Sequence, residues 1–486
     1  MKYEATPHKR LEVGGTPFVY GSATAAIVAL DAVADEALAS FAAPGGIELE
    51  AWLAEGGASR REAFEELVRM RLVRPLGERG PALDPLPPMP YPLATVVLNV
   101  SNKCNLACTY CYEFGDDRLT SPSASRKPRM DAETARKAID LLFDGPASRA
   151  EVSVTFFGGE TLLNFDTIRS ATLHAKARAS QLRRRVSFSL TTNATLLDDE
   201  IVAFLVEHDF GVNVSIDGAR GEHDKHRTFR SGRGSYDAIL PRIRKLLDAK
   251  RGRGRPVGAR VTLTHGLGDV RGTFEHLTRE VGFAHVGFAP VTSSQDRDWA
   301  LDNGEYGRLL AGFRSLAEDY VAAAREGRST GFSNLEDLLA ELHRGANKAH
   351  PCGAGLGLVG VSTEGELGLC HRFVESGEHA LGDVEHGIDE ARRREFLERG
   401  HISKKIACHE CFARPHCSGG CYHEAYVRYR DASAPNLHYC EWVRAWTELG
   451  LECYARIALE NPAFLARFDS RGGAPAALLA AAEASQ

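Results

Sequence analysis

The chain has 486 residues, of which 43% are hydrophobic and 26% charged, and its formal net charge is −6. This composition is typical of a globular chain of two or three domains and excludes an overall basic, nucleic-acid-binding protein. The first residues, MKYEATPHKRLEV, lack the apolar core of a secretory signal, and no apolar run is long enough to span a membrane. We therefore expect a cytoplasmic protein, in which clustered cysteines bind metal or perform redox chemistry more often than they form disulfides.

Residues 1–80 are predicted to form a separate small module. The stretch FVYGSATAAIVAL can supply strands, and two helical patterns follow it, the second with Ser59 and Glu62 at the spacing of a capping box. Four apolar residues then fall on one helical face: Phe64, Leu67, Val68 and Leu72. Strands with short helices indicate a winged-helix-like unit, and because it has no strong basic stripe we expect it to recognise a peptide rather than DNA. The proline-rich residues 81–92 are a predicted linker.

From residue 93 the pattern changes to alternating strands and helices. The predicted strands are residues 95–100, 152–157, 186–190, 211–216, 259–264 and 285–290. A helix beginning after Asp131 would place four residues on one face: Ala135, Ala138, Ile139 and Leu142. Repeated βα units predict a parallel sheet, open or closed into a partial barrel, with the active site at the C-terminal ends of the strands.

Polar or thiol side chains follow four successive strands of this prediction. They are Cys104, Cys108 and Cys111, then Gly158, Gly159 and Glu160, then Thr191, Thr192 and Asn193, then Ser215 and Asp217. Each group alone could be an ordinary turn. Because the carboxyl ends of parallel strands meet at one edge, the four groups together predict a single site.

The cysteine triplet lies in the stretch SNKCNLACTYCYEFG. A cubane 4Fe–4S cluster normally takes four thiolates, so three leave one iron open. An open position can bind a chelating ligand, and an amino acid with free amino and carboxylate groups would be suitable. Zinc is the competing metal, although three cysteines in one loop make a poor closed zinc site.

The CxxxCxxC spacing, with Tyr110 before the last cysteine, resembles the signature of radical S-adenosylmethionine (SAM) enzymes. The resemblance covers residues 93–295 and implies a partial (β/α)6 barrel. It implies that the open iron binds the methionine part of SAM, whose cleavage yields a radical that takes hydrogen from an unactivated carbon. It also assigns eight cofactor contacts: Tyr110, Gly158, Gly159, Glu160, Asn193, Ser215, Asp217 and, most weakly, Arg227.

The remaining clustered cysteines resemble the seven-cysteine SPASM extension, here residues 346–455. The resemblance implies one fully ligated auxiliary cluster and a second with fewer cysteines, and so three 4Fe–4S clusters in all. The first set is Cys408, Cys411, Cys417 and Cys440, and the second is Cys352, Cys370 and Cys421. Seven cysteines leave one iron open or bound by another ligand, for which His350 is a candidate. A zinc module is the alternative, and Cys453 is predicted to be an ordinary buried thiol.

Several stretches, among them FFGGETLLNF and NLHYCEW, resemble the maturation proteins of quinohemoprotein amine dehydrogenase. That family implies thioether crosslinks between cysteine sulfur and methylene carbons of aspartate or glutamate in a small polypeptide, with a flavodoxin or ferredoxin as electron donor and neither nucleic acid nor membrane as partner. A base for the substrate thiol is expected, and His371 and Glu113 are candidates, although both could be ordinary loop residues.

Two alternatives to the thioether-forming maturase stay open. Another radical SAM enzyme of the SPASM type could make carbon–carbon crosslinks or oxidise a side chain, and a non-enzymatic regulator could use the cysteines to sense metal. The full prediction is an α/β protein with a winged-helix-like module, a radical SAM barrel and a SPASM domain. Residues 296–345 would form a helical bridge and residues 456–486 a C-terminal helix or tail.

Overall fold

The computed structural model describes residues 1–78, 86, 90–113, 115, 119, 127–145, 150–266, 268–292, 294 and 296–471. Most of the predicted linker and the end of the predicted tail lie outside these residues. No helix within the described ranges is both long enough and apolar enough to cross a bilayer.

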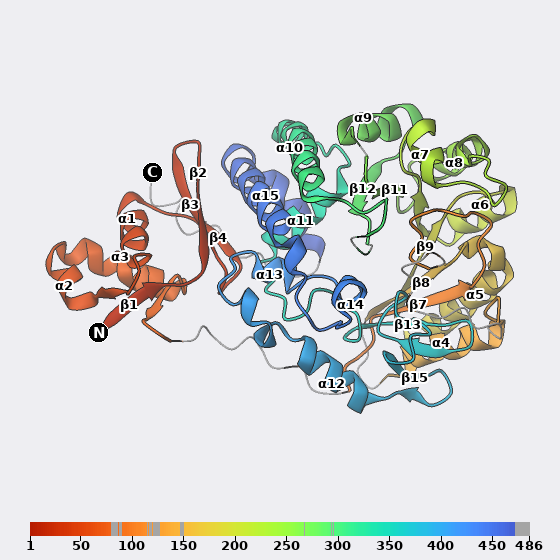
Figure 1. Ribbon diagram of the computed structural model, residues 1–486, viewed down its shortest axis with the longest axis horizontal. Helices are drawn as coiled ribbons and strands as arrows, with labels where there is room; N and C mark the ends of the chain where they lie inside the picture. Colours follow the sequence, from red (N-terminus) through yellow and green to blue (C-terminus); the bar gives the residue numbers. More distant parts are fainter. Residues whose placement is uncertain are drawn as a thin grey trace.

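The N-terminal module contains two small antiparallel sheets and three helices (Figure 1). One sheet has the order β5-β1-β6, formed by Ile47–Glu48, Lys2–Ala5 and Val73–Pro75. The other is the meander β2 (His8–Val13), β3 (Thr16–Gly21) and β4 (Ala26–Ala29). The helices are α1 (Ala32–Phe41), α2 (Leu49–Ala54) and α3 (Gly57–Arg69).

The predicted start of α3 was wrong. The helix begins at Gly57 with Gly56 as its N-cap and no side-chain cap, so Ser59 lies inside the first turn and the predicted capping box does not form. Leu67 is buried as expected, but Val68 is 38% exposed. The apolar stripe is therefore narrower than the sequence pattern indicated.

Six parallel strands form most of a ten-stranded sheet of order β12-β11-β10-β9-β8-β7-β13-β14-β15-β16. They are β7 (Thr95–Ser101), β8 (Glu151–Gly158), β9 (Arg185–Thr192), β10 (Gly211–Ser215), β11 (Val257–Leu263) and β12 (His285–Pro290). All six correspond to the predicted strands. Strand β8 alternates buried and partly buried residues, with Val154 and Phe156 wholly inside.

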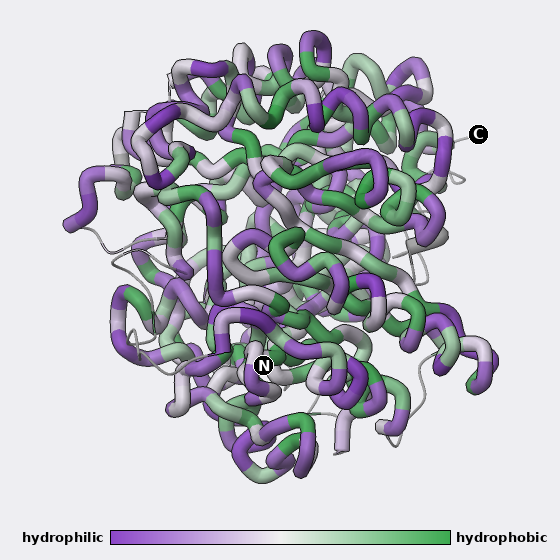
Figure 2. The backbone as a smooth tube through the Cα atoms, turned by 90° about the vertical axis from the view of Figure 1, so that its right-hand side faces the viewer, coloured by the Kyte–Doolittle hydropathy of each residue, from purple (hydrophilic) through white to green (hydrophobic). Residues whose placement is uncertain are grey.

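Helices cover the outer side of these strands (Figure 1). They are α4 (Ala132–Asp144), η1 (Thr161–Asn164), α5 (Phe165–Leu182), α6 (Asp199–Glu207), α7 (Arg220–His226), α8 (Tyr236–Lys250), α9 (Val270–Glu275) and the π-helical η2 (His276–Val281). The outer helices in Figure 2 alternate between hydrophilic and hydrophobic segments, as amphipathic helices do. In α4 all four residues of the predicted face are buried.

The C-terminal part continues the same sheet and adds helices. Strand β13 (Leu358–Val361) pairs in parallel with β7, and β14 (Glu366–Gly368), β15 (Ala380–Asp383) and β16 (Gly387–Ile388) follow antiparallel. The longer helices are α10 (Asn303–Arg325), α11 (Ser333–His343), α12 (Glu390–Gly400), α14 (Tyr422–Tyr429) and α15 (Cys440–Glu460). The shorter ones are η3 (Ile402–Lys404), η4 (Ile406–Cys408), α13 (Arg414–Cys417), η5 (Leu437–Tyr439), α16 (Pro462–Leu465) and η6 (Ala466–Arg471). Because β13 pairs with β7, the segment that carries Cys352 and Cys370 lies beside the strand that leads to the cysteine triplet.

Two hydrophobic cores meet at strand β3. Phe18 and Tyr20 pack into the large core of the main body, whereas Val19 between them packs into the module's own core. Alternate side chains of a strand point to opposite faces of its sheet. The meander β2–β4 is therefore the layer that attaches the module to the rest of the chain.

Candidate functional site

A cavity of about 410 Å³ lies at the C-terminal ends of the parallel strands. The triplet cysteines line it together with seven of the eight expected cofactor contacts: Tyr110, Gly158, Gly159, Glu160, Asn193, Ser215 and Arg227. The predicted convergence of four strand ends is thus present in the structure. Asp217 is buried behind this wall and does not line the cavity.

Backbone hydrogen bonds fix the GGE motif (residues 158–160) against the segment that leads into the triplet. The Gly159 N–H donates to the Ser101 carbonyl at 2.8 Å and the Glu160 N–H to the Lys103 carbonyl at 2.9 Å. Gly158 has a φ of +124°, and a Cβ there would lie 2.5 Å from the Ser101 carbonyl oxygen. Only glycine fits this close approach, so the motif and the cysteine loop hold one fixed relative position.

The Glu160 carboxylate is buried and accepts three hydrogen bonds. Its donors are the Thr192 hydroxyl at 2.6 Å, the Asn193 N–H at 2.8 Å and the Leu162 N–H at 3.1 Å. Burial raises the pKa of Glu160, while these donors oppose the rise. The carboxylate therefore joins the ends of β8 and β9 and still borders the cavity.

Tyr110, Asp217 and Arg227 form a buried polar network beside the triplet. The Tyr110 hydroxyl donates to Asp217 and accepts from Arg227 Nη1 at 2.8 Å. The other Asp217 oxygen accepts from the Thr262 N–H at 3.0 Å. The structure thus places Asp217 where it orients Tyr110 and anchors the end of β11, rather than in contact with the cavity.

The triplet suits a cluster with one open position. Burial raises the pKa of the Cys104 and Cys108 thiols, and the Arg227 guanidinium opposes this rise at Cys108. Three sulfur donors line a cavity that leaves room for a further ligand. The residues present therefore fit a 4Fe–4S cluster that binds a chelating cofactor.

The remaining clustered cysteines lie in two groups, and an iron–sulfur cluster at each of them stays a prediction. Cys408, Cys411, Cys417 and Cys440 line one small cavity, and Arg444 hydrogen-bonds the Cys411 sulfur. We call these four the closed set. Burial raises the pKa of the Cys370 thiol, and the nearby thiols of Cys421 and Cys352 add to this rise, which brings the pKa to about 12. We call these three the open set.

The residues after Cys370 connect the open set to the cavity, a link that the sequence did not reveal. His371 and Arg372 line the cavity. The Arg372 guanidinium stacks 4.2 Å from the Tyr112 ring and donates to the Thr292 hydroxyl at 3.1 Å. His371 packs on Phe157 with 4.4 Å between ring centres. Tyr112 directly follows Cys111, so these side chains bridge the two thiol groups.

Both candidate bases line the cavity, and His350 lies next to the open set. Burial raises the pKa of Glu113 to about 7 and lowers that of His371 to about 3. The Nδ1 atom of His350 pairs with the Tyr422 hydroxyl at 2.7 Å, while its buried Nε2 has no hydrogen-bond partner among the described residues. A nitrogen donor is thus available in the region where the open set lacks a fourth cysteine.

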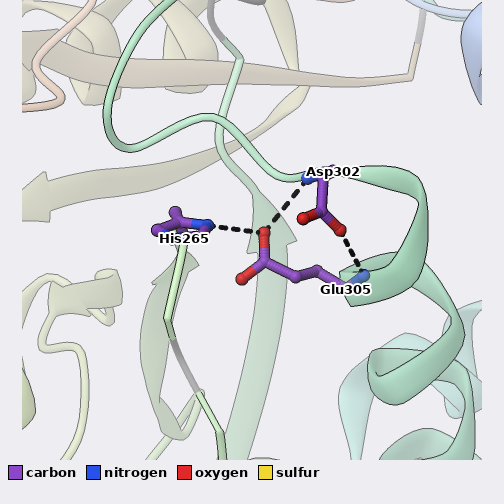
Figure 3. Close-up of side chains that lie close together, drawn as sticks. All are labelled: His265, Asp302 and Glu305. Carbon is purple, nitrogen blue, oxygen red and sulfur yellow. Dashed lines mark hydrogen bonds and ion pairs between the residues drawn. The ribbon is translucent and has the colours of Figure 1, made fainter.

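A separate group of His265, Asp302 and Glu305 resembles a metal site in composition (Figure 3). Asp302 and Glu305 are the reciprocal capping box of α10. Glu305 also accepts from the Gly266 N–H at 2.8 Å and pairs with His265 Nδ1 at 3.0 Å. These interactions explain the cluster as a helix terminus.

Comparison with known proteins agrees with this geometry. Residues 98–277 match the family model of the radical SAM superfamily. A serine-type anaerobic sulfatase-maturating enzyme of Bacteroides thetaiotaomicron is 26% identical over 386 residues, 72% of this chain and 87% of that protein. The structure titled native anSMEcpe with bound AdoMet has a TM-score of 0.62 at 20% identity, covering 78% of this chain and all of that one. Streptococcus suis SuiB bound to precursor peptide SuiA has a TM-score of 0.51 at 13% identity, covering 90% of this chain and all of SuiB.

Proposed function

We propose that this chain, which is an enzyme of the radical SAM superfamily, modifies a peptide or protein substrate. The finer proposal is a thioether crosslink between a substrate cysteine and a side-chain carbon of aspartate or glutamate. The similarity to a sulfatase-maturating enzyme supports a protein substrate, whereas the family match argues against a metal-sensing regulator that is not an enzyme.

The observation that carries the thioether proposal is the position of the open set beside the cavity. Cys352 and Cys421 are exposed, and Cys370 leads directly into His371 and Arg372 on the cavity wall. A metal site with three cysteines has a position left for an external ligand, and a metal-bound thiol is deprotonated. A substrate sulfur held there would lie next to the cavity where hydrogen is taken from carbon.

In this proposal, the cofactor, when bound at the triplet, would supply the radical chemistry that removes hydrogen from the substrate carbon. The chain supplies position and exclusion of water. Arg227 and Asp217 hold Tyr110, while Phe157 and Tyr112 pack against His371 and Arg372 of the cavity lining. The carbon loses one hydrogen atom and the thiol loses one proton, so one electron per crosslink would leave through the auxiliary clusters. The product has two hydrogens fewer per crosslink than the substrate.

The test is mass spectrometry of a small cysteine-containing polypeptide encoded beside this protein, co-produced with it without oxygen. We expect a loss of two hydrogens per crosslink and cysteines that resist alkylation, with neither change when Cys104→Ala replaces the wild type. Loss of mass in a polypeptide whose cysteines can still be alkylated would contradict a thioether and favour carbon–carbon crosslinking or side-chain oxidation. An unchanged polypeptide, with SAM cleavage intact, would contradict it as the substrate.

Maturation of a sulfatase is the second candidate, favoured by the relative's activity. It predicts that co-production of this protein with a sulfatase raises the activity of that sulfatase, and that Cys104→Ala abolishes the gain. No such gain is expected from the thioether-forming enzyme.

A further inference from the structure

Lys405 is a charged residue with almost no contact with solvent. Its side chain is 3% exposed and lies between η3 and η4, where its backbone carbonyl accepts from the Cys408 N–H at 2.8 Å. A buried ammonium is costly unless charges or hydrogen bonds compensate for its lost hydration. The surroundings of Lys405 must therefore explain why it is there.

The described partners of the Lys405 ammonium are neutral. Nζ donates to the Ser418 carbonyl at 3.2 Å and lies 5.3 Å from the centre of the Tyr422 ring. The acidic group that acts on it is Asp431, which already faces Arg399 at 3.6 Å and accepts from Ser433. These contacts leave most of the positive charge without an anionic counterpart among the described residues.

Thiols of both cysteine sets lie near this position. Cys408 and Cys417 of the closed set and Cys352 of the open set all act electrostatically on Lys405. Ser418, its hydrogen-bond acceptor, directly follows Cys417, and Tyr422, under its ammonium, directly follows Cys421. The side chain thus touches residues next to a cysteine of each set.

The local backbone is built to admit this side chain. Gly419 has a φ of +86°, and a Cβ there would lie 2.6 Å from Lys405 Nζ. The hydroxyl of Ser418 donates to the Lys348 carbonyl at 2.6 Å, which holds the accepting carbonyl in place. Such a fit around the ammonium would not be expected if Lys405 only filled space between the helices.

We propose that Lys405 is the buried counter-charge shared by the closed and open sets, and that it raises the reduction potentials of the iron–sulfur clusters they hold. The inference rests on the proposed auxiliary clusters. Reduction adds one electron to a cluster already surrounded by thiolates, so a fixed positive charge favours the reduced form. Removing the charge should make both clusters harder to reduce.

The test is an EPR-monitored reductive titration with dithionite of the full chain, reconstituted with iron and sulfide. A background in which Cys104, Cys108 and Cys111 are alanine confines the signals to the auxiliary clusters. Lys405→Met should shift both midpoint potentials downward, and Lys405→Arg should restore them towards the wild-type values. The matched control is Lys404→Met, because Lys404 is the exposed neighbour and should leave both potentials unchanged.

Unchanged potentials in Lys405→Met, or a shift confined to one cluster, would overturn the proposal of a shared counter-charge. If Lys405→Met loses auxiliary iron, recovery in Lys405→Arg supports the role of charge, and loss in both variants contradicts it. If the parent background itself holds no auxiliary iron, the proposed cofactor content fails and the inference fails with it. If the auxiliary clusters are present but their midpoint potentials do not change, the inference about Lys405 fails while the proposed cofactor content stands.

Discussion

At the scale of single residues, the motifs seen in the sequence have two kinds of role. Gly159 and Glu160 border the cavity and also fix the cysteine loop through backbone hydrogen bonds. Asp217, which the sequence grouped with the cofactor contacts, instead holds Tyr110 and the end of β11. A residue at a strand end can therefore serve the site indirectly, by orienting the residue that lines it.

Gly158→Ala should disrupt the site through its backbone. A Cβ at 2.5 Å from the Ser101 carbonyl and a φ of +124° are both incompatible with alanine. We expect a destabilisation of at least ~1–3 kcal/mol, typical of a strained backbone position, with reduced iron at the triplet. Thermal unfolding and iron analysis would measure both effects.

Gly221→Ala is the matched control for that substitution. Gly221 lies inside helix α7, and a Cβ there meets nothing within 4 Å. Alanine favours a helix over glycine by up to ~1 kcal/mol, so the control should be neutral or slightly stabilising. Equal behaviour of the two variants would contradict the steric argument at Gly158.

At the scale of elements, the periodic patterns were predicted better than the boundaries. All six parallel strands and the buried face of α4 follow from the sequence, because burial on both sides of a sheet imposes apolar runs. The start of α3 did not follow, since Gly56 occupies the N-cap without a side-chain bond. The pairing of β13 with β7 was also absent from the sequence argument, because contacts between distant segments leave no local pattern.

The two helix starts give a direct comparison. Asp131 caps α4 by accepting from the Thr134 N–H at 2.8 Å, whereas Ser59 in α3 is exposed and makes no capping bond. Asp131→Ala should cost about 0.5–2 kcal/mol, the usual value of an N-cap, and Ser59→Ala almost nothing. Thermal denaturation of both variants measures the difference. A comparable loss for Ser59→Ala would mean that its hydroxyl does cap α3.

The capping box of α10 predicts a pH dependence. Although burial opposes it, the hydrogen bonds from Gly266, Asp302 and His265 hold the pKa of Glu305 below its ordinary value. A depressed pKa means that the ionised carboxylate stabilises the folded state above its unfolded pKa of about 4.3. This contribution is lost as the pH falls through the lower folded value.

Glu305→Gln should therefore be less stable than the wild type at pH 7, by ~1–3 kcal/mol for the lost acceptor. The difference should narrow below about pH 4, where the wild-type carboxylate becomes protonated. Unfolding measured from about pH 3 to about pH 7, a range that spans the ordinary pKa of a glutamate, tests this expectation. Glu326→Gln, at the exposed C-terminal end of the same helix, should show little difference at any pH. If Glu305→Gln were less stable than the wild type by the same amount at every pH, the role assigned to the ionised Glu305 carboxylate would be contradicted.

At the scale of the whole molecule, the N-terminal module is joined by β3 to the segment that carries the closed set of cysteines. The Tyr20 hydroxyl bonds His416 Nε2 at 3.0 Å, and both side chains are buried. Arg414 donates to the Ser22 carbonyl at 3.1 Å, and Asn347 donates to the Ala23 carbonyl at 3.1 Å. The module therefore contacts the segment directly before Cys417, which gives the module a fixed place relative to the cysteines of the closed set.

Tyr20→Phe should loosen this junction. It leaves His416 Nε2 buried without its partner, at a cost of ~1–3 kcal/mol, while the ring keeps its packing in the main core. We expect faster hydrogen–deuterium exchange in β3 and α13, with the core of the module around Leu38 and Leu67 unchanged.

The control for Tyr20→Phe is Lys9→Ala, which removes a partly exposed ion pair with Glu448 on the same face of the module. Exposed pairs contribute less than about 1 kcal/mol, so exchange in β3 and α13 should stay near the wild-type rate. Equal acceleration in both variants would mean that the junction depends on surface charge. Acceleration in Tyr20→Phe alone would locate the strength of the junction in the buried Tyr20–His416 contact, because that contact joins strand β3 of the module to the residue before Cys417 of the closed set.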